Sequence, residues 1–429
     1  MLAIHTRLGY RDPVVRGALT SYPESRALNL AIGTWVGWRR ERFPPTQHGP
    51  RKWHDQGMVD WLRFGADMED LATQALRTGK RVTGLLGPTV IQPYRGFVAD
   101  GVAHTRARVM EKPIFDDVPG GLRIDATLAA NLLRWVVLDI AGIEVTVTVG
   151  DHSVTVNSDE NGFVTAKIPV GDIEPGWHSV HYSANDQGRE VTARGRVVLP
   201  DAASQVGFIT DIDDTILATG ITEGMKAVQR TLLRDAYGRK PVPGTPSLYR
   251  GLARGTDSAR PESTFFYVSA GPWNLYDMHA QFLGVRGFPR GPIFLKDWRP
   301  SFPSINDEAK PSINDEAKQA SSYKHARIRR ILDAYPDLDF VLLGDSGEHD
   351  VQVYQDFLKS DPDRIRVAFI RDVTARKPIV DAEDPQDSPD TSRPVVVRDS
   401  IELAKLARRL GLIDSLTVDE VITEIDARV

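Results

Sequence analysis

The C-terminal half of the chain repeats one pattern: a short apolar run, one or two polar residues, and then a longer segment with helical spacing of its apolar residues. Such alternation predicts a parallel β-sheet whose strands are joined by right-handed helical crossovers. Because parallel strands end at the same edge of a sheet, the polar residues that follow them should line one crevice. The expected elements are a strand from 206 into Asp211, strands 265–268, 292–295, 340–343 and 365–370, and helices 225–237, 272–283, 322–335, 351–360 and 400–410.

The first of these strands ends in two carboxylates. Residues 206–209 are largely apolar, and Asp211 and Asp213 follow with a spacing of two. Side chains two residues apart point to the same side of an extended chain, so both acids can act on one substrate. The same Asp-x-Asp spacing occurs in turns and in calcium loops, so the pair alone does not identify a chemistry.

Three further polar segments follow later strands or open a helix. Ser269 and Ala270 come after the second strand and are expected to open a helix, where backbone N–H groups and the helix dipole favour a phosphate. Lys324 lies at the start of the expected helix 322–335, and Asp345 and Asp350 follow the strand 340–343. Each signal alone has an ordinary explanation, because helical lysines are usually solvated and strand-end aspartates often cap helices.

Taken together, the acid pair, hydroxyl, lysine and second acid pair indicate phosphoryl transfer, which needs a positioned nucleophile, a proton donor and cations for the phosphate charge. Asp211 is the expected nucleophile, forming an aspartyl-phosphate, and Asp213 the expected acid and base. Phosphate binding is assigned to Ser269, Ala270 and Lys324, and Mg²⁺ binding to Asp211, Asp213, Asp345 and Asp350, with Asp350 and Glu348 alternatively holding the waters of the metal or orienting Lys324.

This set of segments resembles the haloacid dehalogenase (HAD) superfamily, whose signature is Asp-x-Asp-x-Thr/Val, a strand-end Ser/Thr, a Lys and Gly-Asp followed by a further Asp. Within it, residues 205–375 look like the actin-patch-protein type of Mg²⁺-dependent phosphatidate phosphatase domain. The strings that carry the resemblance lie at 210–216, 269–276, 291–298 and 342–350, with a looser one from 91 onward.

The resemblance implies a HAD-like Rossmannoid parallel sheet with helices on both faces over residues 205–429. It also implies dependence on Mg²⁺ and removal of phosphate from phosphatidic acid to give diacylglycerol. Two features depart from the family pattern: the extension before Met58, and a perfect tandem octapeptide at 303–310 and 311–318. We interpret the repeat as an insertion in a loop, because added loop length costs little. Since it lies just before Lys324, the position of that lysine is the family role that most needs checking.

Between residues 90 and 200 the pattern changes to strict alternation of apolar and polar residues with many β-branched side chains. This pattern is typical of half-buried strands and predicts a small all-β domain, a β-sandwich or open barrel. The expected strands are 106–109, 144–149, 153–156, 163–168, 178–182 and 190–197.

The N-terminal region carries weaker signals. Residues 1–57 have no sustained period and predict a weakly ordered extension, whereas 58–89 carry apolar residues spaced for one helical face. We therefore expect the working protein to start near Met58.

Composition narrows the partners and the compartment. The 429 residues carry a net charge of −5 with acids and bases interspersed, which argues against a nucleic-acid partner. The absence of cysteine excludes disulfides and thiolate metal sites and fits a reducing compartment. The longest apolar stretch near the start, 27–38, is shorter than the roughly 20 residues a membrane helix needs. We expect a cytoplasmic protein, with peripheral membrane contact if the substrate is a lipid.

The sequence does not identify the substrate. An apolar rim of Trp273, Leu275, Tyr276 and Trp298, with the basic residues Arg286, Arg290, Lys296 and Arg299, would suit a lipid, but the same residues also suit packing and a solvated surface. The alternatives are a phosphatase of a soluble ester or phosphoprotein, and a catalytically silent binding scaffold. An intact set of site residues argues against the scaffold.

Overall fold

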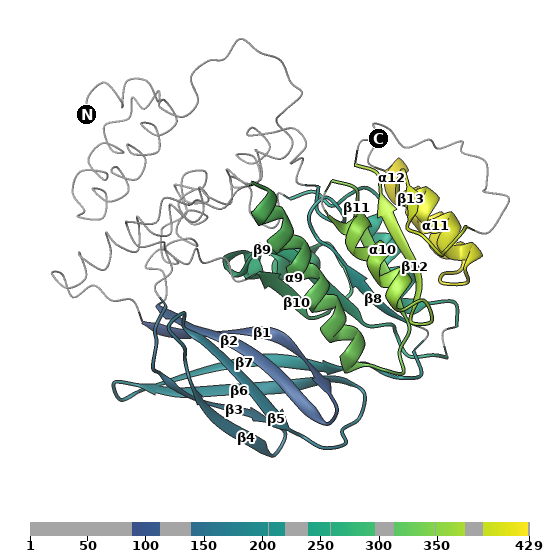
Figure 1. Ribbon diagram of the computed structural model, residues 1–429. Helices are drawn as coiled ribbons and strands as arrows, with labels where there is room; N and C mark the ends of the chain where they lie inside the picture. The colour runs from purple at the N-terminus through teal and green to yellow at the C-terminus, as the bar shows by residue number, and fades with distance from the viewer. Residues whose placement is uncertain are drawn as a thin grey trace, which may run out of the picture.

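The computed structural model describes residues 88–111, 139–204, 206–218, 239–257, 259–296, 313–347, 349–373 and 389–427 (Figure 1). The extension 1–57, most of the expected helix 58–89, the expected helix 225–237, the first octapeptide and Glu348 lie outside these residues. Among the described residues, no helix combines the length and apolarity that crossing a bilayer would demand.

The N-terminal described part is an all-β unit made of one curled sheet. Its strands pair in the order β4-β3-β6-β7-β1-β2-β5, antiparallel except for the contact between β1 and β7. The two end strands, β4 and β5, have Cα atoms within 8 Å of each other, so the sheet bends back on itself, as the open-barrel alternative requires. The two-sheet sandwich is not confirmed. The strands are β1 (Thr89–Ala99), β2 (Val102–Glu111), β3 (Glu144–Val149), β4 (His152–Asn157), β5 (Phe163–Pro169), β6 (Gly176–Asp186) and β7 (Arg189–Leu199).

A bulge in β1 lies where the all-β unit contacts the rest of the chain. The pairing of β1 with β2 slips between Tyr94 and Phe97, and a Cβ at Gly96 would lie 2.1 Å from the carbonyl oxygen of His104. Only glycine fits this approach of two backbones. Beyond the bulge, Phe97 packs into a different core cluster from the one that contains Tyr94.

The second unit contains the expected parallel sheet, with strand order β10-β9-β8-β11-β12-β13. The strand that ends just before Asp211, β8, is central: the chain passes from β8 outward to β9 and β10, and then crosses back to place β11 on the other side of β8. This reversal of strand order is where open α/β sheets form their crevices. The strands are β8 (Gly207–Thr210), β9 (Phe265–Pro272), β10 (Ile293–Lys296), β11 (Phe340–Asp345), β12 (Ile365–Arg371) and β13 (Val395–Val397).

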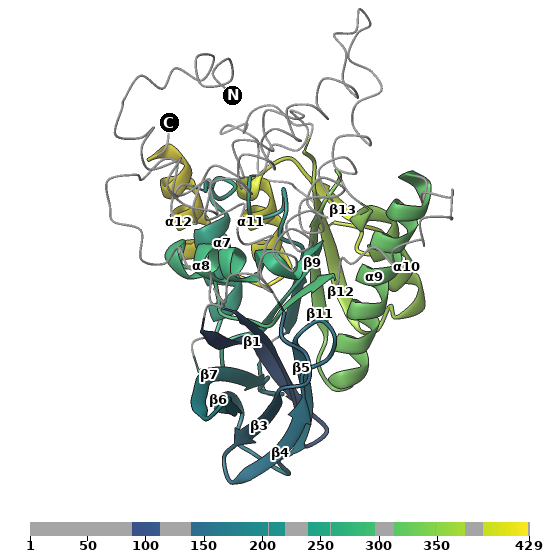
Figure 2. The ribbon, with the colours of Figure 1, turned by 90° about the vertical axis from the view of Figure 1, so that its left-hand side faces the viewer.

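Helices cover both faces of this sheet (Figure 2). One face packs against α7, α8, α11 and α12, and the other against α9 and α10, because successive strand residues face opposite sides: Phe208 lies in the first cluster and Ile209 in the second. The all-β unit contributes to both, through Tyr94 and Phe163 on one face and Phe97 on the other. The helices are α7 (Thr245–Arg254), α8 (Tyr276–Val285), α9 (Ile313–Ala334), α10 (Asp350–Ser360), α11 (Ser400–Arg409) and α12 (Ser415–Asp426).

Two boundaries near the expected site differ from the sequence interpretation. β9 continues to Pro272, and a 3₁₀ turn at Trp273–Leu275 precedes α8, so Ser269 lies within the C-terminal half of β9 and does not open a helix. α9 begins at Ile313, inside the second octapeptide, so the interpretation of 313–318 as loop is wrong. Pro311 comes just before the helix, and Glu, Ala and Lys follow with no Gly or Pro before Pro336, which favours one continuous helix.

Apart from the 3₁₀ turn, four described elements were not among those expected: β1, α7, β13 and α12. The sequence at the start of both helices indicated a helix. Pro246 stands at the start of α7, and Asp414 caps α12, where its carboxylate accepts from the Thr417 N–H at 2.9 Å. A Cβ at Gly251 would lie 2.0 Å from Thr417, so α7 and α12 pack with almost no space between them. They support the sheet face behind β8.

Candidate active site

The acids from two neighbouring strands meet at the C-terminal edge of the sheet. Thr210 of β8 pairs with Leu343 of β11, and the Asp211 N–H donates to the Leu343 carbonyl at 2.9 Å, so the residues beyond these strands emerge side by side. Asp211 and Asp345 are both buried. The sequence interpretation placed both acids at strand ends, and the register brings them together.

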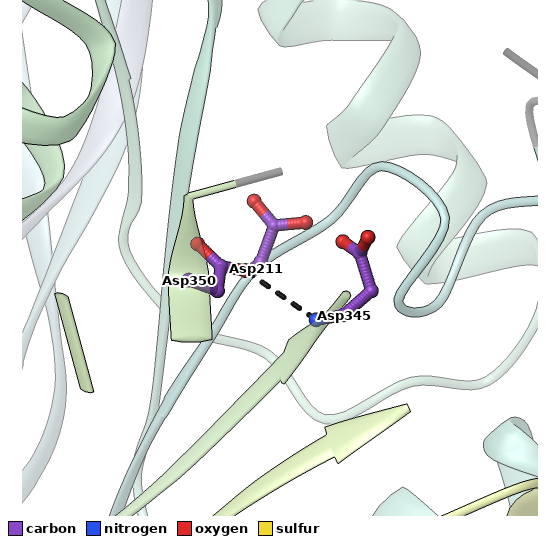
Figure 3. A group of neighbouring side chains, drawn as sticks. All are labelled: Asp211, Asp345 and Asp350. Carbon is purple, nitrogen blue, oxygen red and sulfur yellow. Dashed lines mark hydrogen bonds between the residues drawn. The ribbon is translucent and has the colours of Figure 1, made fainter. Parts of the chain in front are cut away.

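Asp350 joins them to make a group of three buried carboxylates (Figure 3). One oxygen from each of Asp211, Asp345 and Asp350 lies within 4.8 Å of the others. The N-terminus of α10 supplies Asp350, whose Oδ2 accepts from the Asp345 N–H at 3.4 Å. A Cβ at Gly344 would lie 2.5 Å from that same oxygen, so glycine there makes room for the carboxylate.

Lys324 reaches this group from α9. Its Nζ lies 2.8 Å from Asp211 Oδ1 and 2.6 Å from Asp350 Oδ1, and the side chain is almost completely buried. Ile328 and Ile331, one and two turns further on, pack α9 against the sheet and hold the lysine at this depth. The octapeptide therefore does not displace Lys324 from the acids.

The charge of the group suits a divalent cation. One ammonium stands against three buried carboxylates, and burying uncompensated negative charge is costly. Hard carboxylate oxygens that converge from Asp211, Asp345 and Asp350 are the donors that Mg²⁺ prefers. The residues present thus fit the metal that the sequence predicts.

Asp213, the fourth residue assigned to the metal from the sequence, lies outside this group. Its side chain is partly exposed, is not one of the three grouped carboxylates, and accepts at Oδ2 from Ser269 Oγ at 3.1 Å. Ser269 Oγ accepts in turn from the Gly271 N–H at 2.9 Å. Asp213 and the segment Ser269–Gly271 of β9 therefore form a second, more open half of the site.

Gly271 lies next to both the Ser269 hydroxyl and the Asp213 carboxylate. A Cβ built on it would lie 3.1 Å from Ser269 Oγ and 3.9 Å from Asp213 Oδ2, and its φ is not positive, so an alanine here is limited by space alone. A phosphate held by Ser269 and Ala270 would need the space that a methyl group on Gly271 would fill.

Replacing Gly271 by Ala should lower kcat/KM for a phosphate monoester by roughly 10- to 100-fold, because a methyl group displaces the substrate by about an ångström from its reactive position. Steady-state kinetics would measure this. Gly284→Ala is the matched control: this glycine lies on α8 with no atom within 4 Å of an added Cβ, so activity should stay the same and stability should rise by about 0.5 to 1 kcal/mol. Equal activity of the two variants would contradict a phosphate site here.

Two buried tyrosines hold the backbone beside the acids. Tyr354 donates its hydroxyl to the Leu343 carbonyl at 2.9 Å; burial, and then the nearby Asp350, raise its pKa well above its usual range, so the donor stays protonated. Tyr249 pairs with Thr210 Oγ1 at 2.8 Å, and burial raises its pKa in the same way. Both bonds fix the strand residues from which the acids emerge.

The all-β unit contacts the 3₁₀ turn that follows β9. Arg108 binds Asp139 through two bonds of 2.5 and 2.8 Å, and its Nη1 donates to Asn274 Oδ1 at 2.6 Å. The rings of Tyr94 and Trp273 lie 4.6 Å apart. The sequence interpretation missed Arg108 and Asp139, because nothing local to a strand arginine indicates a partner 166 residues away.

This packing also shows where two residues of the expected apolar rim, Trp273 and Tyr276, lie. Trp273 and Tyr276 are buried, and Tyr276 accepts from the Arg95 backbone N–H at 2.7 Å, so these two aromatic residues join the two units and do not face solvent. Trp298 and Arg299 lie outside the described residues.

Comparison with known proteins concerns the parallel unit. Residues 206–372 match the family described as phosphatidate phosphatase APP1, catalytic domain. Over 166 residues the chain is 32% identical to Phosphatidate phosphatase APP1 of Saccharomyces cerevisiae, which covers 39% of this chain and 26% of that protein. Over 169 residues it is 27% identical to an uncharacterized protein of Schizosaccharomyces pombe, which covers 39% of this chain and 25% of that protein. The chain thus matches about a quarter of the length of these relatives.

A solved structure of Parabacteroides merdae beta-glucuronidase aligns with 66% of this chain and 39% of that chain at 10% identity. Its TM-score of 0.24 is too low to indicate a shared fold. The match over 206–372, in contrast, includes the segments with Asp211, Asp213, Ser269, Lys324, Asp345 and Asp350, and the family expected from the sequence is confirmed. Residues 206–372 of this chain belong to the phosphatidate phosphatase APP1 catalytic domain family.

Proposed function

We propose that this chain is a Mg²⁺-dependent phosphomonoester hydrolase that works through an aspartyl-phosphate, with phosphatidic acid as its substrate and diacylglycerol as its product. The observation that carries the proposal is the buried contact of Lys324 with both Asp211 and Asp350, next to the Asp213–Ser269 pair. A binding scaffold has no use for an ammonium buried among carboxylates, because such a group is costly unless it serves a charged ligand.

In the first step a carboxylate oxygen of Asp211 attacks phosphorus, and the bond from phosphorus to the ester oxygen breaks. Asp213 gives its proton to the departing alkoxide. The contact with Ser269 orients the Asp213 carboxyl toward the open side of the site, where a leaving group can reach it.

In the second step water attacks the phosphorus of the aspartyl-phosphate while the Asp213 carboxylate takes up a proton from that water. The bond from phosphorus to the Asp211 oxygen breaks, which restores the carboxylate and releases inorganic phosphate. Asp213 thus serves first as acid and then as base, and the proton that it takes from water restores its initial protonation state.

Lys324, Ser269 and the backbone at Ala270 are assigned to the phosphoryl oxygens, on which negative charge gathers in the transition state. Asp211, Asp345 and Asp350 are assigned to Mg²⁺, with Asp213 kept as a weaker candidate ligand. When bound, the metal neutralises phosphate charge and so lowers the repulsion between the substrate and these carboxylates.

The HAD-like fold and the phosphatidate substrate are also part of this proposal. The central β8, with β9 and β11 on either side and helices on both faces, supports a HAD-like arrangement behind the all-β unit. Phosphatidate is supported by the name of the Saccharomyces cerevisiae relative. Peripheral contact with a membrane follows from such a substrate.

The test is phosphate release from phosphatidate in mixed micelles and from soluble monoesters, each with Mg²⁺ and with chelator. We expect release from phosphatidate that falls to background with chelator and returns with added Mg²⁺. Release confined to soluble esters would retire the lipid substrate, and release that chelator leaves unchanged would contradict the metal dependence.

A further inference from the structure

The turn that carries the proposed general acid has an unusual backbone. Among the described residues, three that are not glycine have positive φ, and two of them, Asp100 and Gln187, lie in hairpin turns of the all-β unit. The third is Asp214, with φ of 52°, directly after Asp213. Left-handed backbone costs an L-residue about 1 to 2 kcal/mol, so surrounding contacts must hold it.

Hydrogen bonds inside the turn hold part of it. The Asp214 N–H donates to the Leu217 carbonyl at 2.8 Å, and the N–H groups of Ile216 and Leu217 both donate to the Ile212 carbonyl at 3.0 Å. These bonds close the turn on itself. They do not tie it to the strand that carries Asp345.

Two contacts make that tie: Thr215 Oγ1 donates to Asp345 Oδ2 at 3.3 Å, and Arg371 binds the Asp214 carbonyl. The Nε of Arg371 donates to this carbonyl at 2.9 Å, and its Nη2 donates to the same oxygen. Arg371 is the last residue of β12 and is paired in register with Asp345, and its own carbonyl accepts from the Ser346 N–H at 2.9 Å. Arg371 thus joins the turn after β8 to the end of β11.

From this geometry we propose that Arg371 is a positioning residue, which holds the Asp214 peptide so that the Asp213 carboxyl faces the leaving group. The inference rests on the proposed function of Asp213 as general acid. Arg371 acts through the peptide of Asp214, and its two donors meet a single oxygen, an arrangement that the planar guanidinium can make and an ammonium cannot.

The role has a kinetic signature that depends on the leaving group. An alkoxide needs a proton as it leaves, whereas 4-nitrophenolate does not. The constant kcat/KM reports steps only up to release of the leaving group, so it separates proton donation from the later attack of water. A misplaced Asp213 should therefore slow alkyl esters selectively in kcat/KM.

Arg371→Met should lower kcat/KM by roughly 10- to 100-fold for an alkyl monoester and by less than about threefold for 4-nitrophenyl phosphate, in line with the usual worth of a general acid. Arg366→Met is the matched control: it lies on the same strand, is more exposed and pairs with Asp339 at 3.3 Å, and both constants should stay at wild-type values. Should Arg371→Met fail to fold, Arg371→Lys keeps the charge without the paired donors, and we expect the same selective loss.

A second comparison isolates the route of the effect. In an Asp213→Asn background, Arg371→Met should cost nothing further in kcat/KM, because a residue that acts only through Asp213 has nothing left to position. Equal losses for alkyl and aryl esters, or an additive loss in the Asp213→Asn background, would overturn the inference and leave the proposed function intact. A wild-type protein that hydrolyses neither these esters nor phosphatidate would refute the proposed function itself.

Discussion

Asp211→Asn should reduce turnover by at least about 10⁴-fold, because an amide oxygen is a poor nucleophile toward phosphorus and no aspartyl-phosphate can form. The fold should persist, since asparagine has the shape of the buried aspartate and its amide oxygen can still accept from Lys324, 2.8 Å from the present Oδ1. Phosphate release measures the loss of turnover. The mass of acid-quenched protein, measured with substrate present, should show a phosphoryl adduct for wild type and none for the variant.

Asp399→Asn is the matched control for this change. Asp399 caps α11, where its carboxylate accepts from the N–H groups of Ile401 and Glu402, and asparagine caps helices about as well as aspartate does. Its turnover should equal that of wild type. Turnover near the wild-type rate in Asp211→Asn would remove Asp211 as the nucleophile, whatever the other residues do.

Lys324→Met should have two effects of opposite sign. Turnover should fall by roughly 10²- to 10³-fold, the usual cost of losing one preorganised donor to a transition state. The concentration of Mg²⁺ that gives half-maximal activity should fall as well, because the variant removes a positive charge from among the carboxylates that bind the metal. Activity measured against Mg²⁺ concentration, for wild type and for Lys324→Met, would give both values.

The same variant should be less stable without metal, because breaking a buried ion pair at one partner typically costs about 3 to 5 kcal/mol. Added Mg²⁺ should restore part of that stability, since a ligand that binds only the folded protein stabilises it. Lys359→Met, on the exposed side of α10, should change neither property. Weaker metal binding in Lys324→Met would contradict the placement of the metal beside this ammonium.

Much of the site could be predicted because its chemistry lies in local patterns. Asp211 and Asp345 each follow an apolar run, and parallel strands bring such positions to one edge regardless of the intervening chain. Lys324 could be assigned from its place in a helical segment and from the family pattern. The start of α9 at Ile313 was missed because repetition was interpreted as loop, although Pro311 and the helix formers after it favoured a helix.

Other roles depend on contacts between distant segments. Asp213 and Asp211 have the same spacing signal, yet one contacts Ser269 and the other Lys324. Trp273 resembles a rim residue in the sequence, but it is buried against Tyr94, which lies 179 residues away in the all-β unit.

Periodicity and strand-end polarity thus suffice to predict the parallel sheet and to select the acids, and the resemblance of the motifs predicts the family, since each depends on residues within a few positions of one another. Only the tertiary structure shows that Asp211 and Asp213 lie in different halves of the site. It also shows two hydrogen bonds between distant segments, from Arg108 to Asn274 and from Arg371 to the Asp214 carbonyl. They join residues 157 and 166 positions apart, and no local propensity encodes which side chains will meet across such distances.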